Sequence, residues 1–281
     1  MSVTVSSIDV VRVRDGRQIA DRDSLAVEEP VEIRLHGQSF AVIMRTPGAD
    51  KELAAGFLLA ERVIQSFDDI GTIEHCTMAG PEALGPRASD AGNIVNVTLQ
   101  DRSPADIEGL LAERRAVVTS SSCGLCGRSS IESVTTGVPP VPVEGTVSSR
   151  VLAALPGLLR TRQPAFDQTG GLHAAALFTW TGELMTAAED VGRHNAVDKV
   201  IGRRLLADSL PASDTLLAVS GRTSFEIVQK AALAGIPVLA AVSAPSSLAV
   251  DLARETGVTL LGFVRGGDYT IYAHSARVRH E

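Results

Sequence analysis

The chain has 281 residues, of which 44% are hydrophobic but only 4% aromatic, and its net charge is −7. This aliphatic composition favours an α/β protein of one large domain or two modest ones, and the charge argues against a general nucleic-acid binder. Three cysteines are too few for a secreted disulfide framework. We find no signal-peptide pattern and no run of roughly 18 apolar residues for a membrane span, so we expect a cytoplasmic protein.

The first half of the chain is predicted to form strands around one helix. Residues 8–14 have the pattern of a strand, and residues 31–35 and 39–44 that of a hairpin turning at His36 and Gly37. A helix of about 15 residues should begin near Asp50, its predicted N-cap, with a buried stripe that comprises Leu53, Phe57, Leu58 and Val63. A loop is expected over 79–92 and a strand over 93–99.

A proline-rich connector separates two unlike halves. Residues 137–145 hold three prolines within six positions, which places a domain boundary near residue 142. We therefore expect a small N-terminal α+β domain (1–142) and a C-terminal α/β domain (143–281). In the second half, helices (148–162, 194–207, 224–234, 246–255) alternate with apolar strands (173–180, 183–188, 215–219, 238–242, 258–264, 269–273). This alternation predicts a mostly parallel sheet with both faces covered.

The most distinctive chemistry lies in a CxxC pair, Cys123 and Cys126, each followed by a glycine. One thiol of such a pair usually has a lowered pKa, and its thiolate is the nucleophile. A zinc site could add only Cys76 and His75 and lacks a second CxxC, so no metal site is predicted, and Cys76 is expected to be buried and inert. A thioredoxin-like redox centre normally opens a helix after a strand. Flanking glycines suit an exposed loop, which favours a persulfide carrier.

Four polar, glycine-rich segments follow strands in the second half: 189–195, 220–224, 243–247 and 263–268. We expect them to meet at one sheet edge, where Arg193, Arg222, Arg265, hydroxyls and backbone N–H groups would suit an anionic nucleotide. Plain salt bridges are the alternative for each arginine. His194 could bind a base or phosphate, act as an acid or base, or only hydrogen-bond at a helix start, and His173 is expected to be structural. The absence of a Walker A or GxGxxG pattern disfavours triphosphate hydrolysis and nicotinamide binding.

These motifs together resemble a known family. The segments 120–127, 189–199, 220–228, 242–250 and 259–265 are similar, in order and spacing, to those of the FdhD (NarQ) formate dehydrogenase accessory proteins. The resemblance runs from about residue 30 to the end of the chain. It implies a sulfurtransferase that takes sulfur from a cysteine desulfurase as a cysteine persulfide. The sulfur would pass to Mo-bis(molybdopterin guanine dinucleotide) before that cofactor enters formate dehydrogenase.

The resemblance also implies roles for particular residues. Cys123 would carry the persulfide, with Cys126 as its companion. The cofactor-binding segment would be Phe263, Val264, Arg265, Gly266, Gly267 and Asp268, with GDP as a fragment ligand. The family further implies a cytidine deaminase-like C-terminal domain and a homodimer. Deamination itself is not expected, since no His-x-Glu follows His173 or His194. Two rival functions are a non-catalytic cofactor chaperone for formate dehydrogenase and a CxxC disulfide oxidoreductase.

Overall fold

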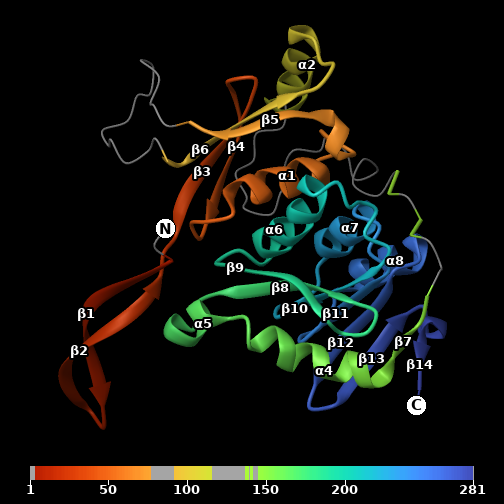
Figure 1. Cartoon of the computed structure of the whole chain (residues 1–281). Helices are drawn as coiled ribbons and strands as arrows, with labels where there is room; N and C mark the ends of the chain where they lie inside the picture. Colours follow the sequence, from red (N-terminus) through yellow and green to blue (C-terminus); the bar gives the residue numbers. More distant parts are fainter. Residues whose placement is uncertain (1–3, 77–91, 116–136, 139, 142–144, 281) are drawn as a thin grey trace.

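The computed structural model describes residues 4–76, 92–115, 137–138, 140–141 and 145–280 (Figure 1). Cys123, Cys126, residue 142 and most of the loop expected over 79–92 lie outside the described residues. Two sheets make up the body: a four-stranded sheet in the first half and a six-stranded sheet in the second. Helices α1 (Asp50–Ala60) and α6 (Arg193–Leu206) lie between them. None of the described helices is long and apolar enough to cross a membrane.

The chain begins with a two-stranded antiparallel ribbon, β1 (Val5–Arg14) and β2 (Arg17–Ala26), which extends away from the body in Figure 1. The strand predicted over 8–14 is confirmed as part of β1. Its partner β2 was not predicted, because both of its faces are largely solvent-exposed and its sequence lacks apolar alternation.

The four-stranded sheet has the order β4-β3-β6-β5, formed by β3 (Glu29–Leu35), β4 (Gln38–Arg45), β5 (Ile70–His75) and β6 (Ile94–Leu99). The predicted β3–β4 hairpin is confirmed, and both His36 and Gly37 have positive φ at its turn. A short 3₁₀ turn (Phe67–Asp69) precedes β5, and α2 (Pro104–Arg115) follows β6.

Helix α1 is enclosed on nearly all sides, because it lies between the four-stranded sheet and α6. Its N-cap is Ala49, with a φ of 55°, so the prediction of Asp50 as the cap is wrong. Asp50 instead forms a two-pronged ion pair with the buried guanidinium of Arg45, at 2.9 Å for each contact. A buried guanidinium without a counter-charge costs more free energy than a helix without a side-chain cap, so the carboxylate of Asp50 pairs with Arg45.

Two glycines let α1 and α6 cross at backbone contact. A Cβ added at Gly56 would lie 2.1 Å from the carbonyl oxygen of Asp198, and one added at Gly202 only 1.8 Å from that of Glu52. Neither helix could approach the other this closely with an alanine at these positions. Through this crossing the first half is fixed against the six-stranded sheet.

The six-stranded sheet has the order β13-β12-β11-β10-β8-β9. Its strands are β8 (His173–Thr179), β9 (Leu184–Asp190), β10 (Thr215–Val219), β11 (Val238–Ala241), β12 (Thr259–Arg265) and β13 (Asp268–Ala273). The predicted α/β class is confirmed, but the sheet is mixed rather than mostly parallel. Strands β9, β10, β11 and β12 share one direction, whereas β8 and β13, which tight turns join to β9 and β12, run antiparallel to their neighbours.

Helices cover both faces of this sheet, as predicted. Helices α6, α7 (Phe225–Leu233) and α8 (Ser247–Thr256) pack on one face, and α4 (Ser149–Arg160) packs on the other. Successive β8 residues alternate between the two cores, which explains why the strand is apolar throughout. A short helix, α5 (Pro164–Thr169), follows α4, and β7 (Val147–Ser148) pairs with β14 (Val278–Arg279) after a 3₁₀ turn (Ser275–Arg277).

The larger of the two cores continues across the predicted domain boundary. It joins side chains of the four-stranded sheet and α1 to those of α6, α7 and α8. The two halves therefore share buried apolar surface, and the division at residue 142 remains a prediction.

Candidate functional site

The loop after β10, the loop after β11 and the end of β12 meet at one edge of the large sheet. The backbone N–H of Thr223 donates to the carbonyl of Ala244, and that of Ser246 donates back to Thr223. The N–H of Phe263 donates to the carbonyl of Ser243 at 3.2 Å. Three of the four predicted segments are thus joined by backbone hydrogen bonds.

The fourth segment, 189–195, reaches the same edge beside Gly221. A Cβ added at Gly221 would lie 3.2 Å from Nδ1 of His173 and 3.8 Å from Cβ of Arg193. His173, at the start of β8, pairs with Asp190, at the end of β9. The start of β8 also pairs with the carboxyl end of β10, so all three strand ends lie at this edge. The predicted convergence of the four segments is confirmed.

A pocket of about 650 Å³ opens along this edge. Its floor follows the strand order, with Arg265 and Gly266 at β12, Val242 after β11, Ser220 after β10 and His173 at β8. A further wall comes from α4, α5 and the loop after α5, by way of Pro156, Gly157, Leu159, Arg160, Gln163, Phe166, Gly170, Gly171 and Leu172. Pockets of this size hold cofactor-sized molecules. The α4–α5 wall was not predicted, because no motif marks it in the sequence.

The turn between β12 and β13 shapes one end of the pocket. Gly266 and Gly267 have φ values of 62° and 93°, which suit a tight hairpin turn. Phe263 also has a positive φ, 53°, where the β12–β13 register shifts. Its ring lies 5.8 Å from the guanidinium carbon of Arg265. An irregularity of this kind re-aims side chains, and a non-glycine residue at positive φ is strained by about 1–3 kcal/mol.

The residues of the predicted cofactor segment, 263–268, therefore lie in different environments. Arg265 and Gly266 line the pocket. Val264 is fully buried and packs in the smaller core, so only its backbone can face a ligand. Asp268 is exposed and pairs in register with Arg265 across the hairpin.

Positive charge surrounds His173, which the sequence analysis expected to be only structural. Burial lowers the pKa of this imidazole, the charge of Arg193 lowers it further, the carboxylate of Asp190 opposes this shift, and the charge of Arg222 adds a smaller lowering. The ring is consequently neutral near pH 7, and an anion at the edge would not face a competing carboxylate in the pocket lining. The Nε of Arg193 and the hydroxyl of Thr223 are buried and find no hydrogen-bond partner among the described residues. Neither residue is part of the pocket lining, so these two atoms do not contact the space that a ligand would occupy.

Of the three roles that the sequence allowed for His194, the structure fits the hydrogen bond at a helix start. It lies in the first turn of α6, nearly buried, with Nε2 3.0 Å from the hydroxyl of Ser224. Burial lowers its pKa to about 4, and the nearby ammonium of Lys230 adds to this effect. It does not line the pocket.

Much of the segment 189–199 holds the two halves together. The carboxylate of Asp190 lies 2.7 Å from Nζ of Lys199 and accepts hydrogen bonds from the backbone of Thr46 and Gly192. Lys199 in turn donates to the carbonyl of Thr46 at 2.8 Å. Sequence reasoning missed this role, because a polar run after a strand resembles a binding loop until its partners are known.

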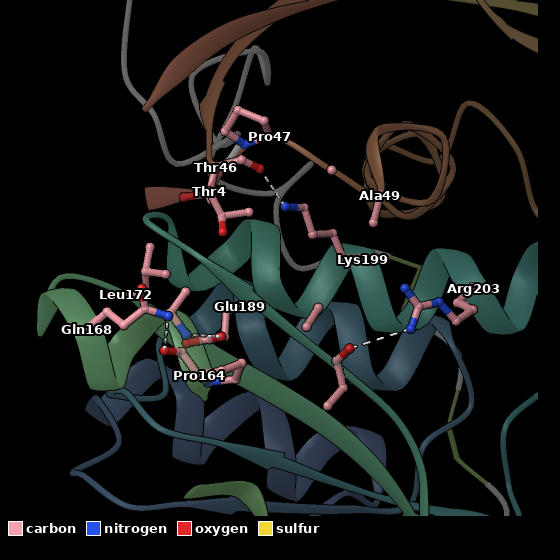
Figure 2. A pocket seen from close by; sticks show the side chains of 14 residues that line it. Thr4, Thr46, Pro47, Ala49, Pro164, Gln168, Leu172, Glu189, Lys199 and Arg203 are labelled. Carbon is pink, nitrogen blue, oxygen red and sulfur yellow. Dashed lines mark hydrogen bonds between the residues drawn. The ribbon is translucent and has the colours of Figure 1, made fainter. Parts of the chain in front are cut away.

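A second pocket, of about 320 Å³, lies where these halves meet (Figure 2). Its polar side chains are engaged within the protein: Lys199 reaches Thr46, and the Glu189 carboxylate accepts from the first N–H groups of α5 at 2.7 and 3.0 Å. Arg203 donates to the hydroxyl of Thr186 at 2.6 Å. This crevice is part of the contact between the two halves, and the edge pocket is the better candidate for binding.

Comparison with known proteins decides the family. Residues 26–279 match the model of the FdhD/NarQ family. The chain belongs to this family.

Its FdhD relatives match over nearly the whole chain. It is 51% identical over 276 residues to the sulfur carrier protein FdhD of Streptomyces avermitilis, covering 96% of this chain and 94% of that protein. The sulfur carrier protein FdhD of Anaeromyxobacter dehalogenans is 50% identical over 273 residues, covering 95% and 91%. The fold matches a crystal structure from Desulfotalea psychrophila, described as a formate dehydrogenase accessory protein, with a TM-score of 0.75, 22% identity and coverage of 99% and 100%.

The FdhD-type thiols, Cys123 and Cys126, lie outside the described residues. Cys76 is described and is a free cysteine. The expectation that Cys76 is buried is wrong, because its side chain is partly exposed directly after the end of β5.

Proposed function

We propose that this protein is a cytoplasmic sulfurtransferase that carries sulfur from a cysteine desulfurase to Mo-bis(molybdopterin guanine dinucleotide), for use by formate dehydrogenase. The observation that carries the proposal is the edge pocket, in a chain half identical to sulfur carrier proteins over nearly its whole length. The pocket includes Arg265 and Gly266 of the segment that the family resemblance assigns to the cofactor.

The pocket suits the anionic arms of this substrate. Arg265 provides a guanidinium that can bind a phosphate through two parallel hydrogen bonds, and the turn glycine beside it lets a phosphate approach the backbone. Arg193 adds positive charge close to His173. A neutral His173 can hydrogen-bond to the ligand or take up a proton when a negative charge arrives.

The sulfur would be carried by Cys123. Its thiolate attacks the outer sulfur of the desulfurase persulfide; an S–S bond forms to Cys123, and the desulfurase cysteine leaves as a thiolate. In the second step the Cys126 thiol attacks the inner sulfur of the Cys123 persulfide. A Cys123–Cys126 disulfide forms, and hydrosulfide leaves toward the molybdenum centre of the substrate. A thiol reductant then restores both thiols.

Mass spectrometry after incubation with a cysteine desulfurase and free cysteine tests the first step. We expect the mass of one added sulfur atom on the peptide that contains Cys123, and none in Cys123→Ala. Cys76→Ala is the matched control, since it removes a free thiol elsewhere and should still load sulfur. Sulfur loading and full activation of formate dehydrogenase by Cys123→Ala would contradict the assignment.

The same variants separate the rival functions. A cofactor chaperone would tolerate loss of both Cys123 and Cys126 while keeping the pocket. A disulfide oxidoreductase would reduce insulin and lose that activity in either cysteine variant. The protein is also proposed to act as a homodimer, which sedimentation can test directly.

A further inference from the structure

The ribbon formed by β1 and β2 exposes an unusual share of apolar surface. Of the twelve large apolar side chains that are exposed in the described part of the chain, five lie on this ribbon: Ile8, Val11, Val13, Ile19 and Leu25. The base of the ribbon lies beside α5, and beyond this base the ribbon projects from the body (Figure 1). A two-stranded hairpin is at best marginally stable alone in water, so contact with another surface would stabilise this one.

The charged residues of the ribbon divide into a paired middle and an unpaired tip. The guanidinium groups of Arg12 and Arg22 form ion pairs with carboxylates of the ribbon itself, at 2.8 and 3.1 Å. At the hairpin turn, Arg14 and Arg17 pair in register and form no ion pair with any of the described residues. Only Asp15 opposes them in this turn, so the tip of the ribbon has a net charge of +1.

An acidic crevice of about 810 Å³ lies at the base of the same ribbon. Its lining includes Leu25 of the ribbon and the carboxylates of Glu28, Glu29 and Asp50, with Arg45 as the only arginine or lysine. The guanidinium of Arg45 is already paired with Asp50 at 2.9 Å and with Glu29 at 3.3 Å. Glu28 is exposed and forms no ion pair within the described ranges. The crevice therefore has an excess of negative charge and a carboxylate available to an arginine.

A second copy of this chain carries the complement of both features. The two ribbons are equal in length, about 33 Å for strands of ten residues. If they pack antiparallel about a two-fold axis, the basic tip of each ribbon reaches the acidic crevice at the base of the other. A ribbon two strands wide covers about 330 Å² on one face, so two facing ribbons bury about 660 Å² in total. The two tips seated in the crevices bring this contact toward the roughly 1,000 Å² of a specific interface.

We propose that the β1–β2 ribbon is the dimerisation arm of this protein, and that the tip of each arm binds the crevice at the base of the partner's arm. The inference rests on the homodimer that is part of the proposed function, and it names the surface through which the dimer forms. It does not depend on the sulfur chemistry, because almost all of the arm precedes the residues that match the family model.

Sedimentation equilibrium of a charge swap tests this arrangement. Arg17→Glu and Glu28→Arg should each raise the dissociation constant of the dimer by at least about tenfold, because each places like charges together twice in a two-fold dimer. The double variant restores opposite charges and should dimerise like the wild type. Arg102→Glu is the control: Arg102 is an exposed arginine outside the arm and the crevice, so its replacement should leave the dissociation constant unchanged.

Hydrogen exchange of the wild type adds a test without substitutions. The backbone amides of residues 5–26 should exchange more slowly at protein concentrations at which the dimer forms. A dimer whose ribbon exchanges as fast as in the monomer, or a double variant that does not recover association, would overturn the inference and leave sulfur transfer standing. A wild-type protein that is monomeric at every concentration would overturn the inference and the proposed dimer together, whereas sulfur loading of Cys123 is judged separately by mass spectrometry.

Discussion

The crossing of α1 and α6 makes Gly202→Ala an informative perturbation. The added methyl group would lie 1.8 Å from the carbonyl oxygen of Glu52 and 2.8 Å from the backbone nitrogen of Gly56. Both contacts are with backbone, so no rotamer change relieves them. Real contacts of this kind are at least 3.0 Å, and the helices must therefore separate by more than about 1 Å.

We expect this separation to lower the free energy of unfolding by about 3 kcal/mol or more, because it loosens the core that joins the two halves. Urea denaturation followed by circular dichroism measures the change. Gly109→Ala is the control: it lies in the exposed part of α2 with no atoms near, and should stabilise by up to about 1 kcal/mol through helix propensity.

The result that would refute the reasoning is a Gly202→Ala protein as stable as the wild type. A second variant checks the mechanism. If Gly202→Ala has already separated the helices, Gly56→Ala should cost less in that background than alone. Strict additivity would indicate that the two substitutions act independently and that the close crossing is not the cause.

Three further predictions follow from the charges described above. Arg45→Met should lower the free energy of unfolding by about 3–5 kcal/mol by leaving the Asp50 carboxylate buried without a cation; urea denaturation measures this, and a loss below about 1 kcal/mol would show that the pair is not needed. His194 has a folded-state pKa lowered to about 4 from 6.5, so the unfolded chain binds the proton first, and stability should fall as the pH drops from 6.5 to 4, by up to about 3 kcal/mol more in the wild type than in His194→Gln. Parallel stability curves for the two proteins would contradict this. A bound anion should raise the lowered pKa of His173, so GDP should bind more tightly as the pH falls from 8 to 6, and calorimetry with His173→Asn should show a weaker pH dependence; equal slopes would exclude His173 as the group that takes up the proton.

The sequence predicted the meeting of the four segments well, for a simple reason. Polar, glycine-rich residues at the ends of apolar strands mark one sheet edge, whichever way the outer strands run. The strand directions were harder to predict, because an apolar strand has the same pattern in either direction. The hairpins at Gly182 and Gly266 determine them.

Other features depend on partners that lie far away in the sequence. Asp50 has the pattern of a helix cap, but a buried arginine uses its carboxylate. Glu189 lies in a polar run that resembles a binding loop, but its carboxylate accepts from the first N–H groups of α5. His173 becomes a pocket residue only because α4 and α5 form a wall opposite it.

The central claim is that the carboxyl edge of the large sheet holds the nucleotide arms of the cofactor, within reach of a sulfur-carrying thiol. The most direct measurement is calorimetry of GDP binding to the wild type and to Arg265→Ala. The account predicts binding by the wild type and at least about tenfold weaker binding by the variant, as expected for the loss of one charged hydrogen-bonding group. No binding by the wild type, or equal binding by both proteins, would contradict it.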